Sequence, residues 1–231
     1  MKHIFITGIS GGLGAYLTRK FVEVGNFQIA GISRKKPIYL TPEYPIQWQK
    51  FDLNQTEKIN SSIPTILNNQ IMDALILNVG IWEKTAFSSD YSFEEMEYAE
   101  IYQLIQVNIT ANIELVRSIL KQGFLKKGGK IIFIGSTWGL ENHGGKEVVF
   151  SATKFALRGM VHSLRENLKH QMISPSVLNL GYLSENEYPQ LPQEIQIPLI
   201  DVWKAIQFLL ATSPYSCVKE IDMPGMFDSN C

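Results

Sequence analysis

A glycine-rich run near the start of the chain carries the first residues that could do chemistry. Residues 7–14 read TGISGGLG, after an apolar stretch at residues 4–6 and before apolar residues at helical spacing from 13 to 24. Glycines let the backbone turn sharply and approach a pyrophosphate, and the N-terminus of a following helix offers free N–H groups and a positive dipole end to phosphates. Strand, glycine loop and helix together predict a dinucleotide site, whereas the glycines alone would indicate only a flexible turn.

A second group of candidate residues lies in the middle of the chain, at Ser136, Phe150 and Lys154. Positions 150 and 154 are one helical turn apart, so their side chains share a face of the predicted helix. Ser136 follows an apolar stretch at residues 130–134, where a serine is otherwise a turn or cap residue. Lysine offers a cation and serine a hydroxyl, but the phenyl ring of Phe150 has no proton to donate.

The end of the second predicted strand bears on which dinucleotide binds. A site selective for NAD usually places a carboxylate there to hold the ribose 2′-hydroxyl. This chain has Ser33-Arg34-Lys35-Lys36 instead, and a guanidinium suits the geometry of a 2′-phosphate. We therefore expect NADP to be favoured over NAD; a solvated basic turn is the alternative.

Strands and helices alternate along the chain, and they must position these residues. Apolar stretches predict strands at residues 4–6, 27–33, 46–51, 74–77, 130–134, 176–180 and 218–223, and periodic stretches predict helices near 13–24, 54–67, 95–120, 150–159 and 199–210. The dipeptide Gly128-Gly129 is expected to break the chain before the fifth strand. This alternation predicts an α/β fold with a doubly wound parallel sheet.

Length and composition bound the remaining possibilities. The 231 residues, 45% hydrophobic and 19% charged, suit one globular domain over residues 1–231. The net charge of −1 gives no electrostatic basis for binding nucleic acid or an anionic membrane surface, and no apolar run is long enough for a membrane span. Two cysteines, one of them the last residue, favour a reducing compartment, so we expect a cytoplasmic protein with no metal site.

The chain resembles the short-chain dehydrogenase/reductase family, in its short single-domain branch, from about residue 2 to residue 223. The resemblance rests on the glycine spacing of residues 7–14, on Asn78-Val79-Gly80, on Ser136 and on Ser-Ala-Thr-Lys at 151–154. The family has tyrosine where this chain has Phe150. The resemblance implies a Rossmann-type sheet of about seven strands in the order 3-2-1-4-5-6-7 with helices on both faces, and assembly as a homodimer or homotetramer.

The resemblance also assigns roles to individual residues. Four positions match the family's catalytic residues: Ser136, which would hydrogen-bond the substrate carbonyl, Phe150 in place of the proton donor, Lys154, which would bond the nicotinamide ribose, and Asn108, which would bend a helix and hold a relay water. The expected cofactor contacts are Gly8, Ser10, Gly12, Leu13, Gly14, Ser33, Arg34, Lys35, Asp52, Leu53, Asn78, Gly80, Lys154, Gly181 and Leu183. Trp138, His143 and Tyr182 are expected to wall the substrate pocket, with a lid near residues 182–198.

These residues predict an NADP-dependent oxidoreductase that acts on a small carbonyl or alcohol substrate. Phe150 cannot protonate an alkoxide, and a positioned general acid is typically worth about 10²–10⁴ in rate. Two explanations are open. The chain is an engineered tyrosine-to-phenylalanine variant, or it is an atypical member in which Tyr182, His143 or a relayed water supplies the proton.

A second hypothesis is a catalytically inactive module that binds NADP and regulates or scaffolds. Departures from the family pattern at Leu180 and Glu185, close to the expected cofactor, favour it. Nucleotide-sugar epimerases and dehydratases of similar fold usually have a different glycine spacing and a larger C-terminal region, which disfavours that class. Aromatic residues near the expected pocket indicate a partly apolar or ring-bearing ligand, or else belong to the core.

Overall fold

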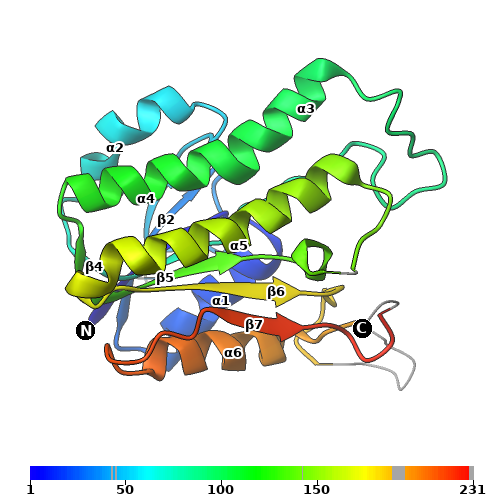
Figure 1. Ribbon diagram of the computed structural model, residues 1–231. Helices are drawn as coiled ribbons and strands as arrows, with labels where there is room; N and C mark the ends of the chain where they lie inside the picture. Colours follow the sequence, from blue (N-terminus) through cyan, green and yellow to red (C-terminus); the bar gives the residue numbers. More distant parts are fainter. Residues whose placement is uncertain (43, 45, 142, 189–195, 229–231) are drawn as a thin grey trace.

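The computed structural model describes residues 1–42, 44, 46–141, 143–188 and 196–228. Within them seven strands form one parallel sheet in the order β3-β2-β1-β4-β5-β6-β7. The strands are β1 (Lys2–Thr7), β2 (Phe27–Ser33), β3 (Ile46–Lys50), β4 (Met72–Leu77), β5 (Leu125–Ile134), β6 (Ser174–Leu180) and β7 (Glu220–Met223). The predicted Rossmann-type α/β fold and its strand order are therefore confirmed (Figure 1).

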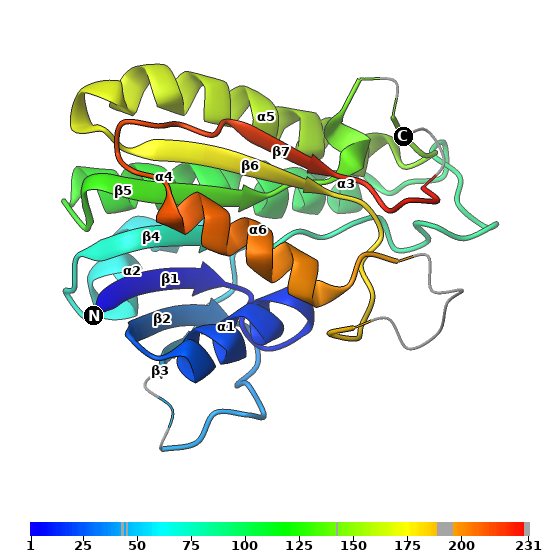
Figure 2. The ribbon, with the colours of Figure 1, turned by 90° about the horizontal axis from the view of Figure 1, so that it is seen from below.

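Helices cover both faces of the sheet (Figures 1 and 2). One face carries α1 (Gly12–Val24) and α6 (Leu199–Ala211); the other carries α2 (Ile59–Ile66), α3 (Tyr98–Ile105), α4 (Ala111–Lys121) and α5 (Val148–Leu168). Side chains of a strand point alternately to the two layers: Phe5 packs with the α2, α4 and α5 side, whereas Ile4 and Ile6 pack with α1 and α6. Because both faces are buried, the central strands read as nearly continuous apolar runs.

The fifth strand differs from its predicted start. Gly128-Gly129 does not break the chain before it, because β5 runs from Leu125 through both glycines to Ile134. The pairing with β4 shifts between Met72 and Ala74, so that residues 126–129 bulge out of the ladder. Gly128 has a φ of 76°, a backbone conformation that glycine adopts without a steric penalty. The glycines therefore serve a bulge within the strand.

The helix expected over residues 95–120 is interrupted. Between α3 and α4, Gln106–Thr110 form one turn of π-helix, which accommodates an extra residue and is frequent at functional sites. Asn108 lies in this turn and is buried. The family resemblance implied a bend at Asn108; the structure has a π turn there, and the Asn108 side chain forms hydrogen bonds with the segment after β4 and with the neighbouring helix α5.

The expected lid falls partly outside the described residues, because residues 189–195 are not among them. On either side, Leu183 and Ile197 pair as a parallel bridge. Glu187 accepts hydrogen bonds from the Tyr16 hydroxyl at 3.2 Å and from the Lys20 ammonium at 2.7 Å, both on α1. The lid and the single-domain organisation over residues 1–231 stay predictions. In the described part of the chain, no helix has the length and apolar character needed to cross a membrane.

Candidate active site

A cavity of about 890 Å³ opens at the C-terminal edge of the sheet. Its lining comes from the segments that follow all seven strands, together with residues of α1, α3, the π turn and α5. Ligands of open α/β sheets bind at this edge. Nineteen of the positions predicted as site residues line it: Gly8, Ser10, Gly12, Leu13, Ser33, Arg34, Lys35, Asp52, Leu53, Asn78, Gly80, Ser136, Trp138, His143, Phe150, Lys154, Gly181, Tyr182 and Leu183.

The glycine loop joins β1 to α1 at one end of the cavity. Gly8 has a φ of 78° and Gly12 a φ of 52°, values that disfavour any residue with a Cβ. Gly14 is the one predicted loop residue that does not line the cavity. A Cβ there would overlap the carbonyl oxygen of Gly8 and approach the Asn78 amide to 2.7 Å, so Gly14 lets α1 pack directly on the strand end. No acidic residue lies in the first turn of α1, which leaves its positive dipole end facing the cavity.

The basic turn after β2 also lines the cavity, next to the glycine loop. Arg34 and Lys35 are exposed and border the cavity. The Ser33 hydroxyl donates to the Lys35 carbonyl at 2.7 Å and accepts from the Trp48 indole at 2.9 Å, which holds the turn. Asp52 also borders the cavity and accepts from the Asn54 amide at 3.0 Å, a local turn bond. Two cations therefore outnumber one carboxylate at this end.

Asn78 and Gly80 shape the cavity behind β4. The Asn78 side chain donates to the Thr7 carbonyl at 3.1 Å, and its backbone amide donates to the Thr7 hydroxyl at 2.9 Å. These bonds tie the ends of β1 and β4 together. A Cβ at Gly80 would lie 3.2 Å from the Lys154 ammonium, so glycine leaves that cation accessible to the cavity.

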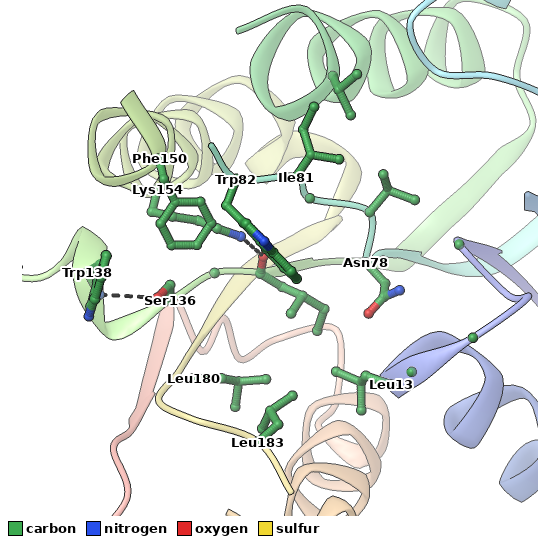
Figure 3. Close-up of a pocket in the computed structure, with 18 of the residues that line it drawn as sticks. Leu13, Asn78, Ile81, Trp82, Ser136, Trp138, Phe150, Lys154, Leu180 and Leu183 are labelled. Atoms are coloured by element: carbon green, nitrogen blue, oxygen red, sulfur yellow. Dashed lines mark hydrogen bonds between the residues drawn. The ribbon is translucent and has the colours of Figure 1, made fainter. Parts of the chain in front are cut away.

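Lys154 is the buried cation of the site (Figure 3). Its Nζ donates to the Ile134 carbonyl at 3.1 Å and lies 5.2 Å from the centre of the Phe150 ring. Burial lowers the pKa of the Lys154 ammonium to about 8, because the low-dielectric surroundings disfavour the charged form. The Phe150 ring is 7% exposed and offers only its π face at the position where the family has a phenol.

Ser136 begins the segment after β5 and points into the same end of the cavity (Figure 3). Its hydroxyl oxygen accepts from the Trp138 amide at 3.3 Å. That bond uses the oxygen as an acceptor and leaves the O–H available to donate to a substrate oxygen. The next turn is held to α5, because the Ser151 hydroxyl donates to the Trp138 carbonyl at 2.7 Å.

Asn108 lies behind the cavity wall rather than in its lining. Its Oδ1 accepts from the Ile81 amide at 2.8 Å, and its Nδ2 donates to the Ile81 carbonyl at 2.7 Å and to the Thr153 hydroxyl at 3.1 Å. The π turn brings the amide into reach of both partners. Through these hydrogen bonds, Asn108 connects the segment after β4 with α5, the helix that carries Phe150 and Lys154.

Two buried glutamates were not anticipated from the sequence. Glu83 is 1% exposed, and its Oε1 accepts from the backbone amides of Val149 and Phe150 at 3.1 and 3.0 Å, so it caps the N-terminus of α5 from a remote loop. Glu147 is also buried and accepts from the Phe87 amide at 2.6 Å. Neither glutamate belongs to a sequence motif, and both bind residues distant in the chain, so the sequence around them does not predict these contacts.

The segment after β6 closes the remaining side. Gly181 and Leu183 line the cavity, whereas Glu185 is exposed and does not, so its carboxylate is kept away from the expected pyrophosphate. Asp228, which no sequence motif marks, also lines the cavity, and its carboxylate accepts from the Gly225 amide at 2.7 Å. A Cβ at Gly181 would overlap this carboxylate.

The end of the cavity near Ser136 and Phe150, here called the substrate end after its predicted role, is aromatic. Trp138 and Tyr182 line it as predicted, and so do Trp82 and Phe87. Burial raises the pKa of the Tyr182 phenol above its usual range, and the nearby carboxylates of Glu147 and Asp228 raise it further. His143 borders the cavity, with its Nδ1 3.0 Å from the Glu141 carbonyl oxygen.

Known proteins with similar sequences and folds agree with this geometry. The family model described as short chain dehydrogenase matches residues 2–191. The 3-oxoacyl-acyl-carrier-protein reductase FabG of Rickettsia typhi is 28% identical over 198 residues, which cover 84% of this chain and 77% of that protein. An uncharacterized oxidoreductase of Mycobacterium tuberculosis is 26% identical over 193 residues, covering 79% and 73%.

Solved structures share the fold at lower identity. BdcA in complex with NADPH superposes with a TM-score of 0.82 at 20% identity, covering 100% of this chain and 96% of that one. A short chain dehydrogenase from Leptospira borgpetersenii with bound NAD+ gives 0.81 at 19% identity, covering 98% and 92%. The matched residues include the glycine loop, Ser136 and Lys154. With most of its length matched by the family model, the chain belongs to the short chain dehydrogenase family, whose members are oxidoreductases that use a nicotinamide cofactor.

Proposed function

We propose that this protein is an NADP-dependent oxidoreductase acting on a carbonyl/alcohol pair of a small molecule. One observation carries the proposal: Ser136 and Lys154 meet at one end of a cavity whose other end has the glycine loop and the exposed pair Arg34 and Lys35. A cavity of about 890 Å³ lies within the range of small-molecule and cofactor sites. The same lining combines polar groups with apolar side chains.

The residues fit a nicotinamide dinucleotide. The Cβ-free positions Gly8 and Gly12 and the helix N-terminus behind them suit a pyrophosphate. Gly80 leaves the Lys154 ammonium open toward the cavity, where it would hold ribose hydroxyls. When bound, the nicotinamide supplies or accepts a hydride. The Ser136 hydroxyl would donate to the substrate oxygen and stabilise the negative charge that develops there.

The preference for NADP rests on the turn after β2. Arg34 and Lys35 border the cavity, and Ser33 holds the turn through its bond to the Lys35 carbonyl. A 2′-phosphate would gain charge-assisted hydrogen bonds from these two cations. The structures of similar fold do not distinguish between the two cofactors, because BdcA was solved with NADPH and the Leptospira protein with NAD+.

Phe150 favours a second candidate, an NADP-binding protein that does not turn over. Its ring is packed against Trp82, Phe87 and Trp138, so the position is filled by an apolar contact rather than left as a gap. If this chain is catalytic, the proton for the substrate oxygen must come from a group other than residue 150. Tyr182 and His143 both border the cavity, and a relayed water is the third candidate.

One experiment separates the two candidates. NADPH is mixed with a panel of ketones and aldehydes, and the loss of its absorbance is followed for this chain and for Phe150→Tyr. Turnover by this chain supports the oxidoreductase. Turnover by the variant alone would mean that the scaffold can carry out reduction but that this chain lacks a proton donor, which supports the second candidate for the chain itself. Binding of NADPH by both, without turnover by either on any member of the panel, supports the binding protein.

Assembly as a homodimer or homotetramer is also proposed. Large apolar side chains are exposed along the outer helices: Tyr98, Tyr102 and Ile105 on α3, Ile113 on α4 and Phe155 on α5. Apolar surface of this kind is what a second copy would cover. Light scattering after gel filtration measures the mass, and a monomer at micromolar concentration would contradict the proposal. A cytoplasmic location stays a prediction.

A further inference from the structure

Five aromatic side chains, here called the aromatic cluster, gather at the substrate end of the cavity. They are Trp82 and Phe87 after β4, Trp138 after β5, Phe150 on α5 and Tyr182 after β6. Phe87 contacts all the others, with ring centroids 5.9 Å from Trp82, 5.1 Å from Trp138, 6.1 Å from Phe150 and 5.9 Å from Tyr182. Its pairs with Trp82, Phe150 and Tyr182 are edge-to-face, an arrangement that aromatic rings prefer.

Three members of the aromatic cluster lie outside the hydrophobic core, whereas Phe150 and Trp138 pack in a small buried cluster beside it. Trp82, Phe87 and Tyr182 are 57%, 44% and 51% exposed, although each borders a cavity. Phe150 lies beneath them and is buried. The Trp82 side chain projects into the cavity beside Phe150 and Lys154 (Figure 3). Contiguous exposed apolar surface that lines a cavity marks a ligand site, because a bound apolar group removes that surface from water.

The backbone is arranged to place the Phe87 ring. Phe87 has a φ of 65°, a left-handed conformation that is an outlier for a bulky side chain. Its amide donates to the buried Glu147 carboxylate at 2.6 Å, which holds the conformation. The loop is also joined to α5 at Glu83, through the amides of Val149 and Phe150. A disfavoured conformation fixed by buried contacts next to a cavity indicates a functional constraint.

Charges of both signs lie around the aromatic cluster, so a cationic ligand and an anionic ligand would each meet at least one group of its own sign. The Lys154 ammonium already faces the Phe150 ring at 5.2 Å, so a second cation would meet it at close range. The Asp228 carboxylate lines the cavity and lies near Tyr182, and Glu147 lies beneath Phe87, so an anion would meet two carboxylates. A neutral ring has neither cost, because like charges in a low-dielectric pocket repel strongly.

We propose that the substrate is a neutral aromatic carbonyl compound or the corresponding alcohol, and that Phe87 determines this specificity. The aromatic ring of the substrate lies against the aromatic cluster, with its carbonyl toward Ser136. Only the placement of the carbonyl rests on the proposed oxidoreductase function; the selection of the ring rests on the aromatic cluster.

The test compares two ketones that differ in the ring alone, acetophenone and cyclohexyl methyl ketone. Dissociation constants are measured by ligand-observed NMR titration, with and without saturating NADP+, which cannot reduce a ketone. Acetophenone should bind more tightly by about tenfold, since each new aromatic contact adds roughly a factor of 2 to 10. Equal affinities, or tighter binding of the cyclohexyl compound, would overturn the proposal.

The variant Phe87→Leu should bring the two affinities to within about twofold, because it keeps an apolar side chain and removes the ring. Phe208→Leu is the matched control: Phe208 is 53% exposed on α6, away from the cavity, and the preference should survive there. If Phe87→Leu still binds acetophenone about tenfold more tightly than the cyclohexyl ketone, Phe87 does not determine the specificity. The comparison of the two ketones on the unmodified chain stands by itself should the variant fail to fold.

Failures of the two proposals are distinguishable. A tenfold preference for acetophenone without turnover of any ketone supports the aromatic site and counts against the oxidoreductase. Turnover of aliphatic and aromatic ketones at equal efficiency, with equal affinities, supports the oxidoreductase and overturns the aromatic specificity.

Discussion

The Lys154 ammonium lies 5.2 Å from the centre of the Phe150 ring, one turn away on the same face of α5. The cation therefore faces a π surface where the family has a phenolic oxygen. Lys154 is buried, and its Nζ donates to the Ile134 carbonyl at 3.1 Å. The helix thus holds a cation beside a phenyl ring, which has no proton to donate.

Restoring that oxygen should restore proton transfer. In Phe150→Tyr, the neighbouring ammonium would lower the pKa of the introduced phenol, and we expect reduction by NADPH to accelerate by about 10²–10⁴. Rates would be measured on the same ketone at saturating NADPH. Phe208→Tyr makes the same change at an exposed position of α6, away from the cavity, and should leave the rate unchanged. An equal rate for this chain and Phe150→Tyr would mean that another group already donates the proton.

Burial of Lys154 should appear in the stability of the protein. The pKa of Lys154 is about 8 in the folded state, below its ordinary value of 10.5, so between these pH values the unfolded chain binds more protons. The free energy of unfolding should therefore rise with pH from about 8 to 10.5, by on the order of 3 kcal/mol from this residue. Urea unfolding of this chain and of Lys154→Met measures the difference. Parallel pH profiles for the two proteins would show that Lys154 is not desolvated.

Glu83 should stabilise the start of α5. Glu83→Ala would leave the amides of Val149 and Phe150 unpaired and buried, at a cost of about 1–3 kcal/mol in the free energy of unfolding. Glu83→Gln keeps an acceptor oxygen and should lose less. The control is Glu95→Ala in the exposed part of the same segment, with an expected change within about 0.5 kcal/mol. Equal losses for the alanine and glutamine variants would contradict the capping role.

The basic turn after β2 should set cofactor choice. Removing both cations with Arg34→Ala and Lys35→Ala should weaken NADPH binding by about tenfold to a thousandfold, because two charge-assisted contacts to a 2′-phosphate would be lost. NADH binding should change little. Lys36→Ala is the control, since Lys36 is exposed in the same turn and does not border the cavity. Titration of fluorescence measures the affinity of each of the three proteins for NADPH and for NADH, and tighter binding of NADH than NADPH by the unmodified chain would contradict the preference.

Local patterns in the sequence predict much of the fold. The apolar runs and their spacing predict the strands and most of the helices, because strand and helix periodicities are local properties. The glycine loop is recognisable for the same reason: its function depends on backbone conformation at Gly8 and Gly12 and on the helix that follows directly. The resemblance to a known family adds the strand order, which periodicity alone does not contain.

The errors arose where packing decides local structure. Gly128-Gly129 indicates a break, but pairing with β4 draws both residues into β5 as a bulge. The helix expected over residues 95–120 contains a π turn, and Asn108 within that turn forms hydrogen bonds with the distant residues Ile81 and Thr153.

The sequence alone determined the type of fold, the dinucleotide loop and the absence of an acid at Phe150, because these follow from residue identity and near-neighbour spacing. Only the tertiary structure decided that Glu83 caps α5, that Asp228 enters the cavity and that Phe87 joins four other rings. Those contacts link segments far apart in the chain. Their free energy depends on burial and distance in the folded state, and neither quantity is written in the order of the residues.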